Sequence, residues 1–240
     1  MLIADCGSTW SKILDTESGE LEIIQTREMV LREGLSFDRA TGHSAKGRCA
    51  EFRNELISLA EGALALVDVP DFSVVDVGGR DIKYVRFEDR KVKKLDWNLA
   101  CGSSTGATIE LLGNYYEIDF SCLEPSKKWI NVTCGVFGME RVLEHVSTGT
   151  PAGESVAMFI HGMVRNVFDF ASRPETLHLS GGFCDNYCFI RTFESYCRAI
   201  PLGRTVPLEG LKTETVDGRL DDDLRRNREY RTKRYPKSKG

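Results

Sequence analysis

The 240-residue sequence predicts an α/β protein built from two similar lobes. Two observations support this prediction: short apolar runs typical of strands alternate with stretches of helical periodicity, and one glycine-containing hairpin pattern occurs twice. With 41% hydrophobic and 28% charged residues, the chain can bury a large core without disulfides. This composition excludes the collagenous, disordered and coiled-coil classes.

The repeated pattern is a strand, an acid, a glycine turn, a lysine and a second strand, and seven residues separate the acid from the lysine in both copies. Its members are Asp5, Gly7, Ser8, Thr9 and Lys12 in the first copy and Asp76, Gly78, Gly79 and Lys83 in the second. Backbone amides in such turns bind anions. An internal duplication therefore suggests two facing turns with a phosphate chain held between them.

The rest of the chain is predicted to be mainly helical. Apolar residues at helical spacing predict helices at 49–67, 107–116, 136–146 and 153–170. A strand at 176–180 then leads through Gly181 and Gly182 into a helix that ends near Arg198, which is a second arrangement suited to a nucleotide. No element is predicted beyond Leu208.

Two of the eight cysteines, Cys101 and Cys134, stand where a glycine-containing turn meets a predicted helix N-terminus. A helix N-terminus favours negative charge, so both could present thiolates. Two thiolates are half of what a [4Fe-4S] cluster requires, and a two-fold homodimer would supply four. Spacing alone leaves two alternatives open: small residues in tight turns, or a zinc site.

Other cysteines and the histidines are predicted to be structural. Cys184 and Cys188 stand four apart on a predicted helix, where core packing is favoured over a metal site. His161 and His178 are interpreted as core or strand residues, and His43 as a weak active-site candidate.

Charge is distributed unevenly along the chain. The net charge is −4, but residues 224–240 carry +7 and the remainder carries −11. An acidic body argues against nucleic acid as a main partner, and the basic end is predicted to be a solvated tail. The start of the chain lacks a signal-peptide pattern and no long apolar window occurs, so we expect a cytoplasmic protein that does not bind membranes.

In its motifs the chain resembles the activator, or archerase, family: ATP-dependent iron-sulfur reductases that activate 2-hydroxyacyl-CoA dehydratases, together with the benzoyl-CoA reductase ATPase group. The resemblance rests on residues 5–12, 40–42, 75–83, 98–106, 133–137 and 179–186. Glycine turns of this kind are shared with acetate and sugar kinases, heat-shock chaperones and actin. A cysteine in each of the segments 98–106 and 133–137 is far more specific.

The resemblance implies a two-lobed actin-like (ribonuclease H-like) ATPase fold and a homodimer with one [4Fe-4S] cluster at the two-fold axis, bound by Cys101 and Cys134. It also implies ATP or ADP between the lobes, with Asp5 and Asp76 acting through Mg²⁺. Gly7, Ser8, Thr9, Lys12, Gly78 and Gly79 would lie near the phosphates, and Gly181 and Gly182 near the adenosine. The implied donor is a ferredoxin or flavodoxin, and the implied acceptor a reductase or dehydratase component.

On this basis we expect a shortened N-terminal lobe at 1–85, a C-terminal lobe carrying the cluster helices at 86–206 and a basic tail at 207–240. The small-residue segment near the family's C-terminus is missing from the sequence pattern. Two other functions stay open: a small-molecule kinase with Asp76 or Asp81 as general base, and a cluster-bearing assembly subunit that does not hydrolyse ATP.

Overall fold

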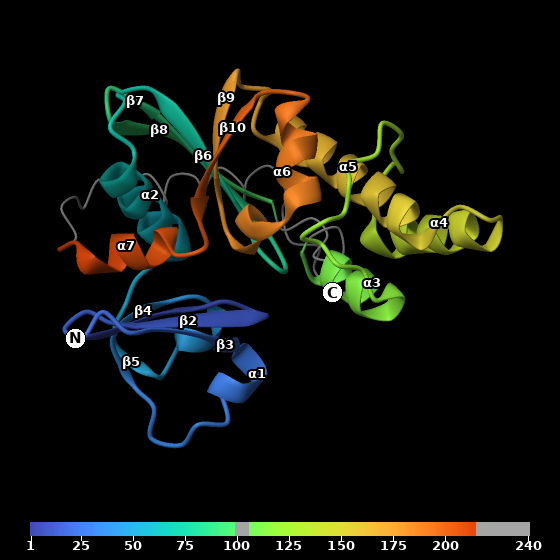
Figure 1. The fold of residues 1–240 in the computed structure, drawn as a ribbon. Helices are drawn as coiled ribbons and strands as arrows, with labels where there is room; N and C mark the ends of the chain where they lie inside the picture. Colours follow the sequence, from blue (N-terminus) through green and yellow to red (C-terminus); the bar gives the residue numbers. More distant parts are fainter. Residues whose placement is uncertain (99–105, 215–240) are drawn as a thin grey trace, which may run out of the picture.

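The computed structural model describes residues 1–98 and 106–214, which form two five-stranded mixed sheets with helices (Figure 1). The first sheet, in the order β3-β2-β1-β4-β5, contains β1 Leu2–Cys6, β2 Trp10–Asp15, β3 Leu21–Gln25, β4 Phe37–Thr41 and β5 Cys49–Phe52. The second, in the order β10-β9-β6-β7-β8, contains β6 Phe72–Val77, β7 Ile82–Glu88, β8 Lys91–Asn98, β9 Thr176–Ser180 and β10 Arg198–Gly203.

Helices cover the second sheet much more fully than the first. The described helices are α1 Thr26–Met29, α2 Glu55–Leu66, α3 Gly106–Tyr116, α4 Gly135–Ser147, α5 Ala152–Phe170, α6 Tyr187–Glu194 and α7 Val206–Lys212, with 3₁₀ turns at His43–Ala45 and Gly182–Asp185. Helix α1, between β3 and β4, has only four residues. None of the described helices combines the length and hydrophobicity needed to span a membrane.

The two predicted hairpins occupy equivalent places in the two sheets. Strand β1 pairs antiparallel with β2 and parallel with β4, which sets Asp5 opposite Lys12 and Thr41. Strand β6 pairs antiparallel with β7 and parallel with β9, which sets Asp76 opposite Lys83 and Ser180. The sequence repeat is therefore also a structural repeat, centred on the two acids.

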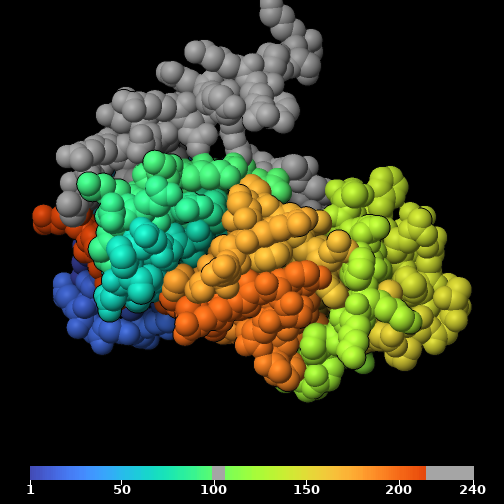
Figure 2. Space-filling view, turned by 90° about the horizontal axis from the view of Figure 1, so that it is seen from above, coloured from blue at the N-terminus to red at the C-terminus, as the bar shows by residue number. Residues whose placement is uncertain are grey.

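The main core lies between the second sheet and α5, where Phe159, Ile160 and Met163 are fully buried. On its other face the sheet packs against α2, whose Leu59 and Ala60 belong to a separate cluster with strands β6 to β8. Helix α4 lies at the end of the molecule away from the first sheet (Figures 1 and 2). Its fully buried Val142 belongs to the larger core, and its partly buried Met139 packs against that core.

Three boundaries differ from the sequence predictions. The predicted helix 49–67 begins instead as strand β5, because Cys49 pairs with Phe37 of β4 and Asn54 caps the helix through the backbone N–H of Leu56. The predicted helix to Arg198 ends at Glu194, and the edge strand β10 follows. The expected lobe boundary at residue 85 falls inside β7, since the two sheets divide between residues 52 and 72.

The expected basic tail at 207–240 begins too early, because residues 207–212 belong to helix α7, which packs closely on α2. A Cβ on Gly62 would lie 1.9 Å from the carbonyl oxygen of Val206, and one on Gly210 would lie 2.0 Å from that of Ser58. Two small residues thus allow backbone contact between α2 and α7. The remaining tail, residues 215–240, lies outside the described residues.

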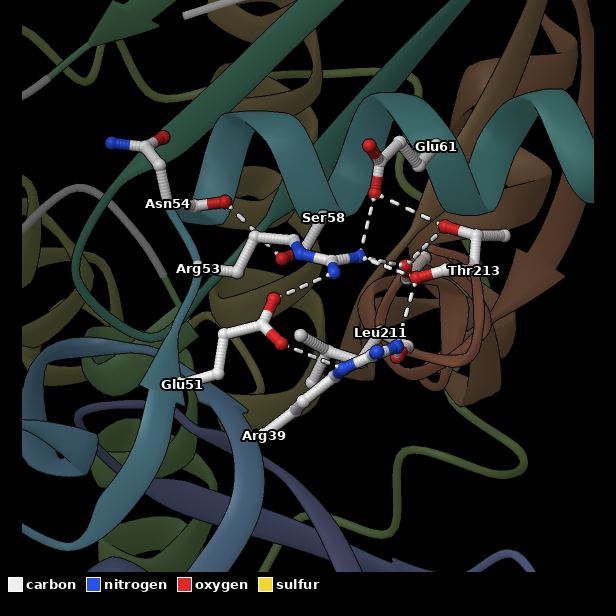
Figure 3. A network of polar contacts seen from close by, with 9 residues as sticks. Arg39, Glu51, Arg53, Asn54, Ser58, Glu61, Leu211 and Thr213 are labelled. Carbon is white, nitrogen blue, oxygen red and sulfur yellow. Dashed lines mark hydrogen bonds and ion pairs between the residues drawn. The ribbon is translucent and has the colours of Figure 1, made fainter. Parts of the chain in front are cut away.

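A buried polar network ties α7 to the first sheet (Figure 3). Arg53, 4% exposed, donates through Nη1 to Glu61 Oε2 at 2.8 Å and to the carbonyl oxygens of Gly210 and Thr213 at 2.7 and 3.0 Å. Its Nη2 donates to Glu51 of β5, which also accepts from Arg39 of β4. The network therefore joins the two lobes through the end of α7.

Candidate functional site

A cavity of about 520 Å³ is lined by residues of both lobes. Ten of the predicted site residues line it: Asp5, Gly7, Ser8, Thr9, Lys12, Asp76, Gly78, Gly79, Gly181 and Gly182. They come from strand ends and turns that are far apart in sequence. The structure therefore brings the two glycine turns and the third, C-terminal glycine pair into one site.

The two repeated turns lie almost against each other. A Cβ on Gly79 would stand 2.3 Å from Thr9 Oγ1, so a larger residue there would displace the Thr9 side chain. Gly181 has φ +102°, and a Cβ on it would lie 2.6 Å from the carbonyl oxygen of Val77. These glycines keep the backbone open to the cavity, which is the arrangement that phosphate groups require.

The acid and lysine of the first copy are bonded to each other. Lys12 Nζ lies 2.7 Å from Asp5 Oδ2, and both side chains are largely buried. Burial by itself lowers the pKa of Lys12, but the charge of Asp5, with that of Asp76, outweighs it and raises the pKa. Lys12 therefore stays protonated and provides a fixed positive charge inside the cavity.

The second copy uses different partners. Asp76 Oδ1 accepts a hydrogen bond from Ser180 Oγ at 2.7 Å, while Lys83 Nζ lies 2.6 Å from Asp81 Oδ1 and 2.9 Å from Glu55 Oε2. Burial lowers the pKa of Lys83, but the surrounding acids raise it above its ordinary value. Burial raises the pKa of Glu55, although Lys83 opposes this effect.

Several residues of this cavity were missed by the sequence analysis. Glu55 enters from the start of α2, where the chain passes from the first sheet to the second, and Trp97 lies near Lys83, whose Nζ is 5.2 Å from the ring centroid. Arg204 also lines the cavity, directly after β10. Lys83 itself had a sequence signal, through the hairpin repeat, whereas nothing local in the sequence marks Glu55 or Arg204 as functional.

The site fits a nucleotide with a hydrated divalent cation. Asp5 and Asp76 offer carboxylate oxygens on two sides of the cavity, which are the ligands that Mg²⁺ and its waters prefer. The glycine turns leave space that side chains would fill.

Helix α3 is bonded directly to the second turn of this site. The backbone N–H of Gly106 donates to the carbonyl oxygen of Gly78 at 3.2 Å, and that of Ala107 donates to Gly79 at 3.0 Å. These are the first residues of the helix that follows the Cys101 segment. A shift of the turn would therefore be transmitted to the start of α3.

The predicted cluster ligands are described only in part. Cys134 is the N-cap residue of α4, half-buried and directly before Gly135, whereas Cys101 lies outside the described residues. A thiol at the N-terminus of a 13-residue helix has the chemistry expected of a cluster ligand. Residues 1–98 and 106–214 contain no group of three or more His, Cys, Asp or Glu that could hold a metal ion.

Cys184, Cys188, His161 and His178 lie outside the cavity, whereas His43 is part of it. Cys184 lies in the 3₁₀ turn and Cys188 in α6, and burial raises the pKa of their thiols to about 11 and about 12. His161 contacts the Ser126 carbonyl oxygen and the Tyr196 hydroxyl, and His178 contacts the Ser73 carbonyl oxygen.

Sequence comparison finds a relative among curated proteins, and no protein-family model matches the chain. The relative is the (R)-2-hydroxyglutaryl-CoA dehydratase activating ATPase of Acidaminococcus fermentans, 26% identical over 178 residues, which cover 69% of this chain and 68% of the relative.

Comparison of structures finds the same group of proteins. The activator of the 2-hydroxyisocaproyl-CoA dehydratase from Clostridium difficile, with bound ADPNP, matches 88% of this chain and 92% of its own with a TM-score of 0.70 and 19% identity. Component A of the A. fermentans (R)-2-hydroxyglutaryl-CoA dehydratase matches 88% and 93% with a TM-score of 0.68 and 22% identity. This chain therefore has the two-lobed actin-like ATPase fold, and its sequence and structural relatives are activators of 2-hydroxyacyl-CoA dehydratases.

Proposed function

We propose that this protein is an ATP-hydrolysing activator that delivers a low-potential electron to a reductase or to an enzyme like the 2-hydroxyacyl-CoA dehydratases. The observation that carries the proposal is the pair of hydrogen bonds that the start of α3 donates to the carbonyl oxygens of Gly78 and Gly79. They connect the nucleotide cavity to the helix behind the Cys101 segment. The sequence and structural similarity to the dehydratase activators supports the same activity.

The residues of the cavity have distinct roles in this proposal. The turns at residues 7–9 and 78–79 would lie against the phosphates, and Lys12 would neutralise part of their charge. Asp5 and Asp76 would hold Mg²⁺ through its waters, and the cation would supply charge neutralisation for phosphoryl transfer. Glu55, half-buried beside Lys83, would orient an attacking water.

Loss of the terminal phosphate changes the charge between the two turns. Because the turns lie in contact across Gly79 and Thr9, such a change would alter the separation of the lobes. The Gly78–Gly79 turn would carry α3 with it through the two backbone hydrogen bonds. Nucleotide state would thereby control the position of the helices next to the predicted cluster.

Cys101 and Cys134 are the proposed cluster ligands, two from each subunit of a homodimer. A [4Fe-4S] cluster held in this way supplies one-electron transfer at low potential. The N-terminus of α4 lies next to Cys134, and the partial positive charge of a helix N-terminus favours a negatively charged group. The same helix exposes Val136, Phe137 and Leu143, apolar side chains suited to a subunit or partner contact.

The test is anaerobic purification with iron and acid-labile sulfide measured per chain. We expect about two irons per chain in a dimer, lost in both Cys101→Ala and Cys134→Ala. Cys122→Ala is the matched control, because Cys122 is an exposed thiol outside the cavity and away from helix N-termini. An iron-free wild type after anaerobic reconstitution would overturn the proposal.

Nucleotide turnover separates the remaining functions. ADP formation without any added phosphoryl acceptor, stimulated by the partner enzyme, agrees with the proposal. ADP formation that requires a small-molecule acceptor indicates a kinase. Tight nucleotide binding with iron present but no hydrolysis indicates an assembly subunit.

A further inference from the structure

The end of the cavity beyond Gly181 and Gly182 has an apolar wall built on α3. Gly106 and Gly113 stand seven residues apart on one face of this helix. The Phe183 ring lies 2.7 Å from where a Cβ on Gly106 would be, and the Phe120 ring lies 2.3 Å from that of Gly113. Both rings line the cavity, with Ile109 of the same helix.

Arg204 provides a polar group at the same end of the cavity. It follows β10 directly and forms an ion pair with Asp185, which ends the 3₁₀ turn after Gly181. Both residues line the cavity, and the Arg204 side chain is one-third exposed. Its Nε is buried and has no hydrogen-bond partner among residues 1–98 and 106–214. The guanidinium is thus oriented by Asp185 while part of its hydrogen-bonding capacity is unused.

We propose that Arg204, oriented by Asp185, binds the nucleoside part of the nucleotide. The inference rests on the proposed function for the position of the phosphates at the two glycine turns. A guanidinium is planar and positively charged, and it stacks on aromatic rings as well as donating hydrogen bonds. Arg204, Phe183 and Phe120 all line this cavity, so a flat base bound among them would meet both polar and apolar groups. The ligand class is a nucleoside phosphate, as opposed to an inorganic polyphosphate.

Calorimetric titration with two probes tests this assignment: ADP, and inorganic tripolyphosphate, each with Mg²⁺. In Arg204→Ala we expect the dissociation constant for ADP to rise about tenfold, as loss of a cation–π or stacking contact predicts. The affinity for tripolyphosphate stays unchanged, because it reaches only the glycine turns. Arg204→Lys keeps the charge without the planar group and recovers only part of the loss.

Arg191→Ala is the matched control, because Arg191 forms a similar ion pair with Glu194 on the exposed side of α6, away from the cavity. It should change neither affinity. If Arg204→Ala leaves ADP binding unchanged, or weakens ADP and tripolyphosphate equally, Arg204 does not bind the nucleoside and the proposal is wrong, while the proposed ATPase function stands. If the wild type binds neither probe, both are wrong.

Discussion

Removal of the Glu61 carboxylate should destabilise the folded protein strongly. Glu61 is 8% exposed and accepts hydrogen bonds from Arg53 Nη1 and Thr213 Oγ1 (Figure 3). In Glu61→Ala the Arg53 guanidinium stays buried with only Glu51 to neutralise it. Loss of one partner of a buried ion pair costs about 3–5 kcal/mol. We expect a decrease of that size in the free energy of unfolding.

Two further variants separate the ion pair from the burial of its charges. Burial raises the pKa of Glu61 above its ordinary value although Arg53 opposes this, so desolvation outweighs the attraction between the two charges. Glu61→Gln keeps hydrogen-bonding capacity toward Arg53 and Thr213, and we expect it to lose less stability than the alanine variant. The double variant Arg53→Met, Glu61→Leu removes both charges and should recover most of the loss.

The assay is urea unfolding followed by tryptophan fluorescence and circular dichroism on all four proteins. The midpoint should fall in the order wild type, Glu61→Gln, Glu61→Ala, with the double variant above the alanine variant. If Glu61→Ala lowers the free energy of unfolding by less than about 1 kcal/mol, the Arg53–Glu61 ion pair contributes no more than an exposed surface pair does. That result would refute the claim that its burial makes the loss of one partner costly. A double variant less stable than Glu61→Ala would refute the claim that desolvation dominates.

Three other predictions follow from contacts in the two lobes. Gly210→Ala should lower the free energy of unfolding by about 1–3 kcal/mol or more, because its Cβ would meet the Ser58 carbonyl oxygen. The control Gly182→Ala has open space around its Cβ and should unfold like the wild type in thermal or urea unfolding. Burial lowers the pKa of His178 below 6.5, so the stability that the neutral imidazole contributes is present above pH 6.5 and is lost as the pH falls. His178→Gln should remove this part of the pH dependence of unfolding. A variant with the same pH profile as the wild type would contradict the prediction. Asp5→Asn should lower ATP turnover about 10²-fold or more. The control Asp15→Asn, at the far end of β2, should leave turnover unchanged. Equal effects of the two variants would show that Asp5 has no specific role in ATP turnover.

The hairpins and the phosphate-binding turns were predictable because their signals are local. Asp5 and Lys12 become opposite residues in an antiparallel pair as soon as the glycine turn closes, and the same holds for Asp76 and Lys83. Helical periodicity likewise predicted α3, α4 and α5 within one or two residues.

The elements that were missed depend on contacts between distant residues. Strand β10 pairs in parallel with β9, although α6 lies between the two strands in the sequence. Its Pro201 is tolerated because β10 is at the edge of the sheet. Helix α7 is held by α2, the first sheet and two arginines from β4 and the segment after β5, none of which is near it in sequence. Glu55 and Arg204 join the cavity only through these long-range arrangements.

The two copies of the repeat differ in the partners of their acids and lysines. Lys12 neutralises Asp5 directly, whereas Lys83 makes its ion pairs with Glu55 and Asp81 and leaves Asp76 hydrogen-bonded to the uncharged Ser180. Under the proposed function, Asp76 would therefore attract the hydrated cation more strongly than Asp5, which is paired with Lys12. Because the carbonyl oxygens of Gly78 and Gly79 accept backbone hydrogen bonds from the start of α3, a change in the second turn at the proposed cation and terminal phosphate would reach that helix directly.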